Sequence, residues 1–103
     1  MEVIYTVCSS SEEAKLIGKI LVQEKLCSCV NILPKMESIY FWEGKIIEDK
    51  EVVLLIKTHK GLFDKVSHKI KSLHSYEVPC VFSVSVNNVT RDYVTWMNNC
   101  IEQ

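Results

Sequence analysis

The sequence predicts an α+β domain in which helices cover one sheet of four strands. Three observations support this fold class. Short runs of β-branched and aromatic residues alternate with two segments whose apolar residues recur at helical spacing. Only 3 Gly and 2 Pro occur among 103 residues, which leaves little room for long irregular loops. The length suits one core, so we expect residues 1–103 to form a single domain.

The first two elements are a buried strand and an amphipathic helix. Residues 3–7 are apolar apart from one Thr, as expected for a strand in the core. Ser10 and Glu13 have the spacing of a capping box, in which each side chain satisfies a free backbone N–H. The helix predicted over residues 12–25 has one apolar face, which is carried by Ala14, Ile17 and Leu21.

A strand and a hairpin are predicted after this helix. Residues 27–33 have strand character, and we expect Pro34 to end or bend the strand. Two further β-rich runs, residues 38–42 and 45–47, flank a Glu-Gly pair. Such a pair between two strand-like runs is typical of a tight hairpin turn.

The second half of the chain continues the alternation of strands and helices. Five consecutive apolar residues at 52–56 are typical of a central strand covered on both faces. A second amphipathic helix is predicted over residues 61–74, a fourth strand over residues 81–86, and a short last helix after Thr90, which can cap it. The order βαββαβ plus a C-terminal helix is that of a ferredoxin-like sandwich with a long hairpin.

The hairpin is apolar on both of its faces. Because strand side chains alternate, Ile39 and Phe41 point to one face and Tyr40 and Trp42 to the other. In a small sheet of this topology, helices cover only one face. We expect a neighbouring subunit to cover the other, because a long hairpin projects beyond the core of so short a chain. The alternative is that the terminal helix covers it through Trp96.

Charge and composition exclude several classes of partner. The chain has 12 Lys and Arg against 13 Asp and Glu, a formal net charge of −1, so it has no basic field for nucleic acid or an anionic membrane. Arg91 is the only Arg, which excludes an arginine cluster for phosphate groups. No signal peptide or membrane-length apolar run is found, and the 5 Cys are irregularly spaced. We therefore expect a cytoplasmic protein with reduced thiols.

The sequence contains no recognisable catalytic motif. Neither a G-x-S-x-G turn nor a Gly-rich phosphate loop occurs, so we predict that the protein is not an enzyme. An acylphosphatase-like enzyme of the same topology would need an arginine cradle, and Arg91 lies after the fourth strand. Cys27 and Cys29 are two residues apart in a predicted strand, which would place both thiols on one face. Such a pair can bind Cu(I), but buried Cys residues more often fill a core.

A polar turn after the second helix is the best candidate for a binding site. His74 closes the predicted helix, and Tyr76 and Glu77 follow in a turn held by Pro79. An imidazole, a phenol and a carboxylate within four residues can form a small polar cleft. A histidine at a helix C-terminus also interacts well with the helix dipole, so capping and packing remain an equal alternative.

Four segments of the chain resemble, in order, the signatures of the CutA divalent-ion tolerance family. The first comprises residues 24–26 (Glu-Lys-Leu) and 29–34 (Cys-Val-Asn-Ile-Leu-Pro). The second comprises residues 38–40, 42–46 (Trp-Glu-Gly-Lys-Ile) and 51–58. The third is Leu-His-Ser-Tyr-Glu-Val-Pro at residues 73–79, and the last is Asp92 and Tyr93 with Trp96. The resemblance thus covers nearly the whole chain.

The resemblance implies a ferredoxin-like subunit in a tight homotrimer, similar in architecture to the PII signalling proteins. Members of this family are linked to the tolerance or binding of divalent ions, copper above all, and have no established catalytic reaction. The resemblance further implies a ligand cleft between subunits, formed by Trp42, Glu43, Tyr76 and Glu77. It also leads us to expect a metal at His74, Glu77 and Cys80.

The chain departs from the family pattern at several positions. Ser75 replaces the Pro of the usual His-Pro-Tyr-Glu turn, and Cys80 replaces a Glu that commonly follows the next Pro. Lys35 stands where Gly often follows Leu-Pro. Some bacterial members have a Cys late in the first strand and a second His before the turn, where this chain has Thr6 and Leu73. At residue 80, a softer sulfur ligand thus replaces a carboxylate.

We predict one of two functions for the trimer. The first is a cytoplasmic role in divalent-ion tolerance, with copper or another divalent cation bound, though not obligatorily, at clefts between subunits. The alternative is a PII-like trimer that senses a small molecule or docks a partner protein and uses no metal. Neither function involves nucleic acid or a membrane.

Overall fold

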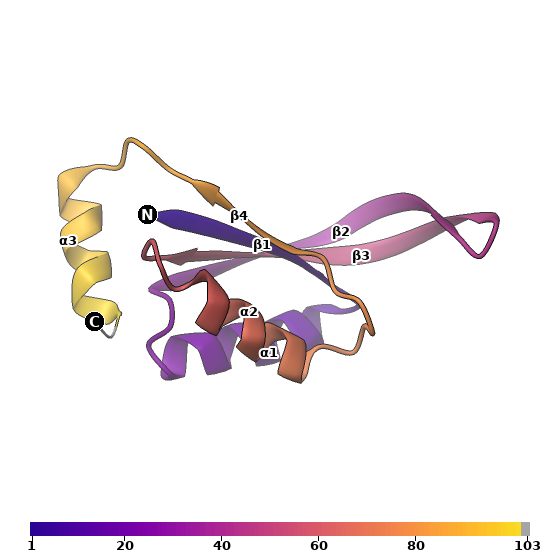
Figure 1. Ribbon diagram of the computed structural model, residues 1–103, viewed down its shortest axis with the longest axis horizontal. Helices are drawn as coiled ribbons and strands as arrows, with labels where there is room; N and C mark the ends of the chain where they lie inside the picture. The colour runs from indigo at the N-terminus through magenta and orange to yellow at the C-terminus, as the bar shows by residue number, and fades with distance from the viewer. Residues whose placement is uncertain (102–103) are drawn as a thin grey trace.

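Seven elements follow one another in the predicted order. The computed structural model describes residues 1–101 (Figure 1). Within them the elements are β1 (Glu2–Cys8), α1 (Ser11–Gln23), β2 (Cys29–Trp42), β3 (Lys45–Thr58), α2 (Phe63–Leu73), β4 (Val81–Ser85) and α3 (Arg91–Cys100). The predicted α+β fold class is therefore confirmed.

The four strands form one antiparallel sheet in the order β2-β3-β1-β4. In Figure 1, α1 and α2 lie together on one side of this sheet, whereas α3 stands at its end. Because side chains alternate along a strand, Ile4 points to the helices, and Tyr5 and Val7 point to the opposite side. We call that opposite side the open face.

The core lies between the sheet and the two helices. It is built by residues that recur every second position in the strands and every third or fourth position in the helices. The side chains with no exposed surface include Ile4, Leu54 and Ile56 of the sheet and Ile17, Leu21, Val66 and Ile70 of the helices. The predicted apolar helix faces are thus confirmed as core.

The hairpin of β2 and β3 is longer than the rest of the domain requires. Each strand has 14 residues, and the chain measures 47 × 26 × 22 Å along its principal axes. The free end of the hairpin projects well beyond the helices (Figure 1). Glu43 and Gly44 form the turn with φ of 51° and 77°, which is the backbone of a type I′ turn. The predicted two-residue turn is confirmed.

Pro34 bends the second strand without ending it. Pairing with β3 continues on both sides of Pro34, and the register shifts between Leu33 and Met36. The extra residue forms a bulge in which Lys35 has φ of 63°, a left-handed conformation that suits glycine better. Proline has no backbone N–H to donate. Because β2 is an edge strand, this missing donor does not break a hydrogen-bond ladder in the centre of the sheet.

The helix ends differ from the predicted ones for local reasons. Ser10 accepts the Glu13 N–H at 3.1 Å as predicted, but the Glu13 carboxylate binds the N–H of Ser9 rather than that of Ser10. The second helix begins two residues later than predicted, because Gly61 has φ of 97°. Thr90 precedes α3 without a capping hydrogen bond from its side chain.

The terminal helix does not cover the hairpin. In Figure 1, α3 lies at the end of the sheet opposite the free end of the hairpin, where the Lys57 ammonium group is 5.7 Å from the ring centre of Tyr93. Ile39, Phe41 and Ile46 of the hairpin are 71%, 70% and 68% exposed. Within the described chain these apolar side chains therefore have no cover.

Gly18 allows α1 to approach β2 closely. A Cβ at this position would lie 2.8 Å from Cγ2 of Val30. We predict that Gly18→Ala destabilises the fold by about 1 kcal/mol or more, because steric overlap outweighs the gain in helix propensity. The free energy of unfolding, measured by urea denaturation, tests this. In Gly18→Ala/Val30→Ala the overlap is relieved. The free energy of unfolding of the double variant should therefore fall by less than the sum of the decreases in the two single variants. Additive losses would contradict the close approach.

Candidate functional site

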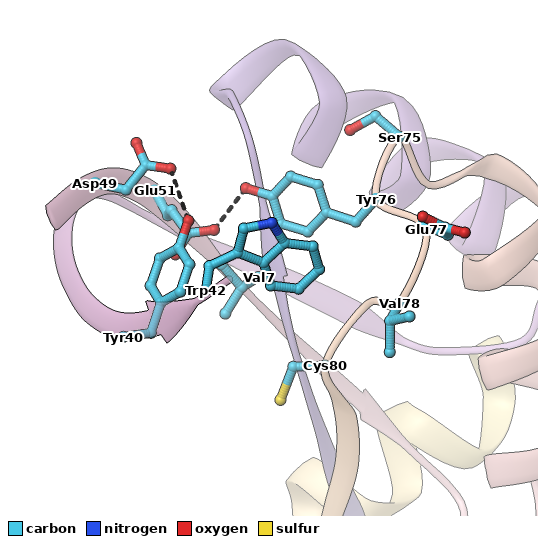
Figure 2. A pocket seen from close by; sticks show the side chains of 10 residues that line it. All are labelled: Val7, Tyr40, Trp42, Asp49, Glu51, Ser75, Tyr76, Glu77, Val78 and Cys80. Atoms are coloured by element: carbon cyan, nitrogen blue, oxygen red, sulfur yellow. Dashed lines mark hydrogen bonds between the residues drawn. The ribbon is translucent and has the colours of Figure 1, made fainter. Parts of the chain in front are cut away.

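A cleft lies where the hairpin leaves the body of the domain. Its volume is about 630 Å³, and Figure 2 shows the ten residues that line it. They come from four parts of the chain: the end of β1, the arms β2 and β3, and the loop between α2 and β4. The cleft therefore depends on the hairpin and the loop being held together.

Two phenols and two carboxylates form one wall of the cleft. The Tyr76 hydroxyl donates to Oε2 of Glu51 at 2.5 Å, and the Tyr40 hydroxyl donates to Oδ2 of Asp49 at 3.5 Å (Figure 2). Burial raises the pKa of Tyr76. The hydrogen bond to Glu51 and the negative charge of the Glu51 carboxylate raise this pKa further. Tyr76 is therefore a neutral donor at physiological pH.

His74 ties the loop to the end of β1. Its Nε2 lies 2.7 Å from the carbonyl oxygen of Val7, and its Nδ1 accepts the N–H of Tyr76 at 3.0 Å. Since the carbonyl can only accept, the Nε2 atom carries the proton. Both ring nitrogens are thus engaged by the backbone, and the imidazole positions the residues that follow it.

Glu13 makes a second tie between the same loop and α1. Its carboxylate accepts the Ser75 N–H at 2.8 Å and the Ser9 N–H at 2.9 Å. Partial burial alone would raise the pKa of Glu13, but hydrogen bonds from Ser75 and Ser9 and the attraction of His74 lower it below its ordinary value of 4.5. The carboxylate form is the one that holds the loop.

Cys8, Glu13 and His74 form a compact group of metal-ligating side chains. Their ligand atoms all lie within 4.8 Å of one another, and Cys8 is completely buried. Burial, and to a lesser degree the charge of Glu13, raises the pKa of the Cys8 thiol to about 12. The group therefore combines a neutral thiol with an imidazole and a carboxylate.

The structure divides the expected site residues between two places. Trp42, Tyr76, Glu77 and Cys80 line the cleft, although Glu77 points away from the aromatic side chains in Figure 2. Glu43 lies in the hairpin turn, outside the lining. His74 also lies outside it, beside Cys8 and Glu13. The three expected metal ligands therefore do not form one compact group in the described chain.

Sequence reasoning does not select Tyr40, Asp49 and Glu51. Taken alone, the two acidic residues are most simply interpreted as a solvated part of the returning strand. The signal that could have found them is alternation, because Asp49 and Glu51 are two residues apart and share one strand face. The strand pairing places Tyr40 and Trp42 on that same face.

The two thiols that were expected to share a strand face do not do so. The strand begins only at Cys29, so Cys27 lies before it and is buried in the core with 1% exposure. Cys29 pairs with Lys57 on the open face. Burial raises the pKa of Cys27 to about 12. Core filling explains Cys27, and the structure provides no paired-thiol site here.

Comparisons with known proteins agree along the whole chain. Residues 2–100 match the family described as CutA1 divalent ion tolerance protein. The divalent-cation tolerance protein CutA of Thermus thermophilus is 41% identical over 96 residues, 93% of either chain. A rice relative, the chloroplastic protein CutA 1, is 37% identical over 97 residues, and the chain spans 55% of its length.

Solved structures show the same fold. The crystal structure of CutA1 from Pyrococcus horikoshii has a TM-score of 0.95 and 35% identity, with 100% of both chains covered. The crystal structure of CutA1 from Oryza sativa has a TM-score of 0.96 and 35% identity, with 99% of this chain and 94% of that chain covered.

We predict that Glu13→Gln destabilises the fold by about 1.5 kcal/mol at pH 7, because the hydrogen bonds to the loop lose their charge. The folded-state pKa of Glu13 lies below its ordinary value, so this stabilisation is complete above about pH 4.5 and is lost as the pH falls further. Urea denaturation between pH 3 and 7 measures the effect, with the exposed Glu12→Gln of the same turn as control. A loss that does not change with pH would contradict a role for the charge.

Proposed function

The chain belongs to the CutA1 divalent ion tolerance protein family, and we propose that it binds copper or another divalent cation in a cytoplasmic homotrimer that catalyses no reaction. The observation that carries the metal part of this proposal is the compact group of Cys8, Glu13 and His74. Thiol, imidazole and carboxylate together suit copper or zinc better than magnesium or calcium, which prefer oxygen ligands alone.

The donor group fits the metal that the family name implies. Cys8 stands two residues beyond Thr6 on the same face of β1, so it places a thiol close to the position where some family members have theirs. His74 can free a nitrogen only by giving up its contact with Val7 or Tyr76. Cys8 must also lose its proton, so metal affinity should fall at low pH. The metal ligands that were expected from the sequence are His74, Glu77 and Cys80. That set and the compact group have only His74 in common.

We predict that His74→Ala weakens binding of Cu²⁺ to the metal-free protein by about tenfold or more, because an imidazole ligand is lost. Isothermal titration measures the affinity, and His68→Ala, an exposed histidine of α2, is the matched control. Cys8→Ser and Cys80→Ser distinguish the two candidate donor sets, since only the true ligand should reproduce the loss. Unchanged affinity in His74→Ala would remove His74 from the site.

The apolar surface of the subunit supports a closed oligomer. Leu33, Phe82 and Val84 are 51%, 44% and 54% exposed on the open face, in addition to the apolar hairpin. The two edges of the sheet are different strands, β2 and β4, and each has an unpaired side. Contacts between two unlike edges repeat head to tail, and they form a closed ring when the rotation from one subunit to the next completes a full turn. We propose a ring of three subunits.

We predict that light scattering of the purified protein gives three times the subunit mass of 11.9 kDa. Phe41→Lys should shift the mass toward the monomer, because a charge would enter an apolar contact. Leu16→Lys, at an exposed position on α1, is the control and should leave the mass unchanged. A monomer at micromolar concentration in the unsubstituted protein would contradict the proposal.

The cytoplasm is proposed from the sequence. Within residues 1–101, no helix has both the length and the apolar character that are needed to cross a membrane. Among similar proteins, one from Archaeoglobus fulgidus is described as periplasmic, and the rice relative as chloroplastic. Location therefore differs among relatives.

A second candidate function is small-molecule sensing by the same trimer. The observation that favours it is the cleft at the base of the hairpin, whose volume of about 630 Å³ lies in the usual range for small ligands. Three aromatic side chains and three carboxylates line it, and the His74 group lies outside it. The cleft and the metal-ligating group can therefore serve different ligands.

A further inference from the structure

We propose that the cleft binds an alkylammonium group, such as an end of a linear diamine, between the rings of Tyr40, Trp42 and Tyr76 and the carboxylates of Asp49 and Glu51. The inference deepens the second candidate function and rests on the cleft being a ligand site. It assigns the chemical class of the ligand. The charge, the aromatic walls and the free acceptors of the cleft support it.

The lining of the cleft is strongly acidic in a nearly neutral protein. It contains Asp49, Glu51 and Glu77, and no Lys, Arg or His is among its residues. The chain as a whole has 12 Lys and Arg against 13 Asp and Glu. Lys50 separates two of these acids in sequence, but alternation directs it to the other face of the strand. The field inside the cleft therefore favours a cation.

Aromatic rings form the walls beside these carboxylates. Tyr40, Trp42 and Tyr76 gather around the same space in Figure 2. Ring faces attract ammonium groups through the π-electron quadrupole, Trp most strongly. Each phenol donates its O–H to a carboxylate, which leaves its ring richer in electrons and fixes its orientation. In the single subunit the Trp42 side chain is 57% exposed, so its ring is not covered by the subunit's own residues.

The hydrogen-bond capacity of the cleft suits an ammonium group. Asp49 accepts from Tyr40 and from the N–H of Lys50, and Glu51 accepts from Tyr76. A carboxylate has about four lone-pair sites, so both acids can accept further N–H bonds without losing these partners. The methylene groups of the ligand would contact Val7 and Val78, the aliphatic residues of the lining.

A bare divalent ion fits the cleft less well. Among residues 1–101, Cys8, Glu13 and His74 are the side chains that form a compact three-donor group, and the acids of the cleft are not part of it. A metal ion would also gain nothing from the apolar part of the wall. An alkylammonium ion uses the carboxylates, the rings and the valines together.

The ammonium group can come from two sources with the same chemistry. One is a free diamine, and the other is a Lys side chain of a neighbouring subunit. Titration of the assembled protein with 1,4-diaminobutane, followed by calorimetry, tests the first source. We expect saturable binding that weakens about tenfold in Glu51→Gln, which keeps the shape of the side chain and removes its charge. In Trp42→Ala the expected loss is about 5- to 30-fold.

Matched controls separate this site from general charge attraction. Glu48→Gln removes an acid of the same strand on its other face, and Trp96→Ala removes an exposed aromatic side chain of α3. Both variants should bind the diamine as the unsubstituted protein does. Equal weakening in Glu51→Gln and Glu48→Gln would overturn the proposal, because it would show attraction without a site.

The second source has its own readout. One outcome is that the diamine does not bind, while the oligomers of Glu51→Gln and Trp42→Ala both dissociate at a higher protein concentration than the oligomer of Glu48→Gln. In that case the ammonium group belongs to a Lys of the neighbouring subunit. If the diamine does not bind and all these variants assemble equally, the proposal is wrong. Cys8 belongs to the metal-ligating group but does not line the cleft. Diamine binding in Cys8→Ser and Cu²⁺ binding in Glu51→Gln should each be unchanged, so failure of one ligand does not affect the test of the other.

Discussion

The pairing of β2 with β3 is the constraint on which the rest of the structure depends. Fourteen residues on each side of a two-residue turn make a ladder that α1 and α2 cover only at its base. The inner half of β3 supplies the centre of the core, and the outer half carries Asp49 and Glu51 into the cleft. One strand thus stabilises the fold and builds the site.

The end of β1 is the second point where several elements meet. His74 contacts the carbonyl of Val7, and Glu13 holds both Ser9 and Ser75, so β1, α1 and the loop after α2 are linked within a few residues. These contacts have a structural role even without a metal. They place Tyr76 against Glu51, which closes one side of the cleft. The metal-ligating group and the cleft are therefore neighbours with separate side chains.

Local sequence rules predicted most of the fold and only part of the site. The amphipathic helices, the hairpin turn and the succession of strands and helices along the chain follow from short-range patterns such as Ala14, Ile17 and Leu21 or Glu43–Gly44. The closeness of Cys8 to His74 could not be predicted in this way, because it depends on how the loop after α2 returns to β1. Asp49 looked like a solvated residue because its partner, Tyr40, lies on the other arm of the hairpin.

The bulge at Lys35 determines to which face of the hairpin each side chain beyond it points. Between the pairs Leu33–Val53 and Met36–Glu51, two residues of β2 lie opposite one residue of β3, so every side chain further out points to the face opposite to that expected for unbroken alternation. Without the extra residue, Ile39 and Phe41 would face the cleft, and Tyr40 and Trp42 would turn away from it. Loss or gain of one residue at this point would exchange a hydrogen-bonding wall for a purely apolar one. The chemistry of the cleft thus depends on the length of the chain at a place that lies outside it.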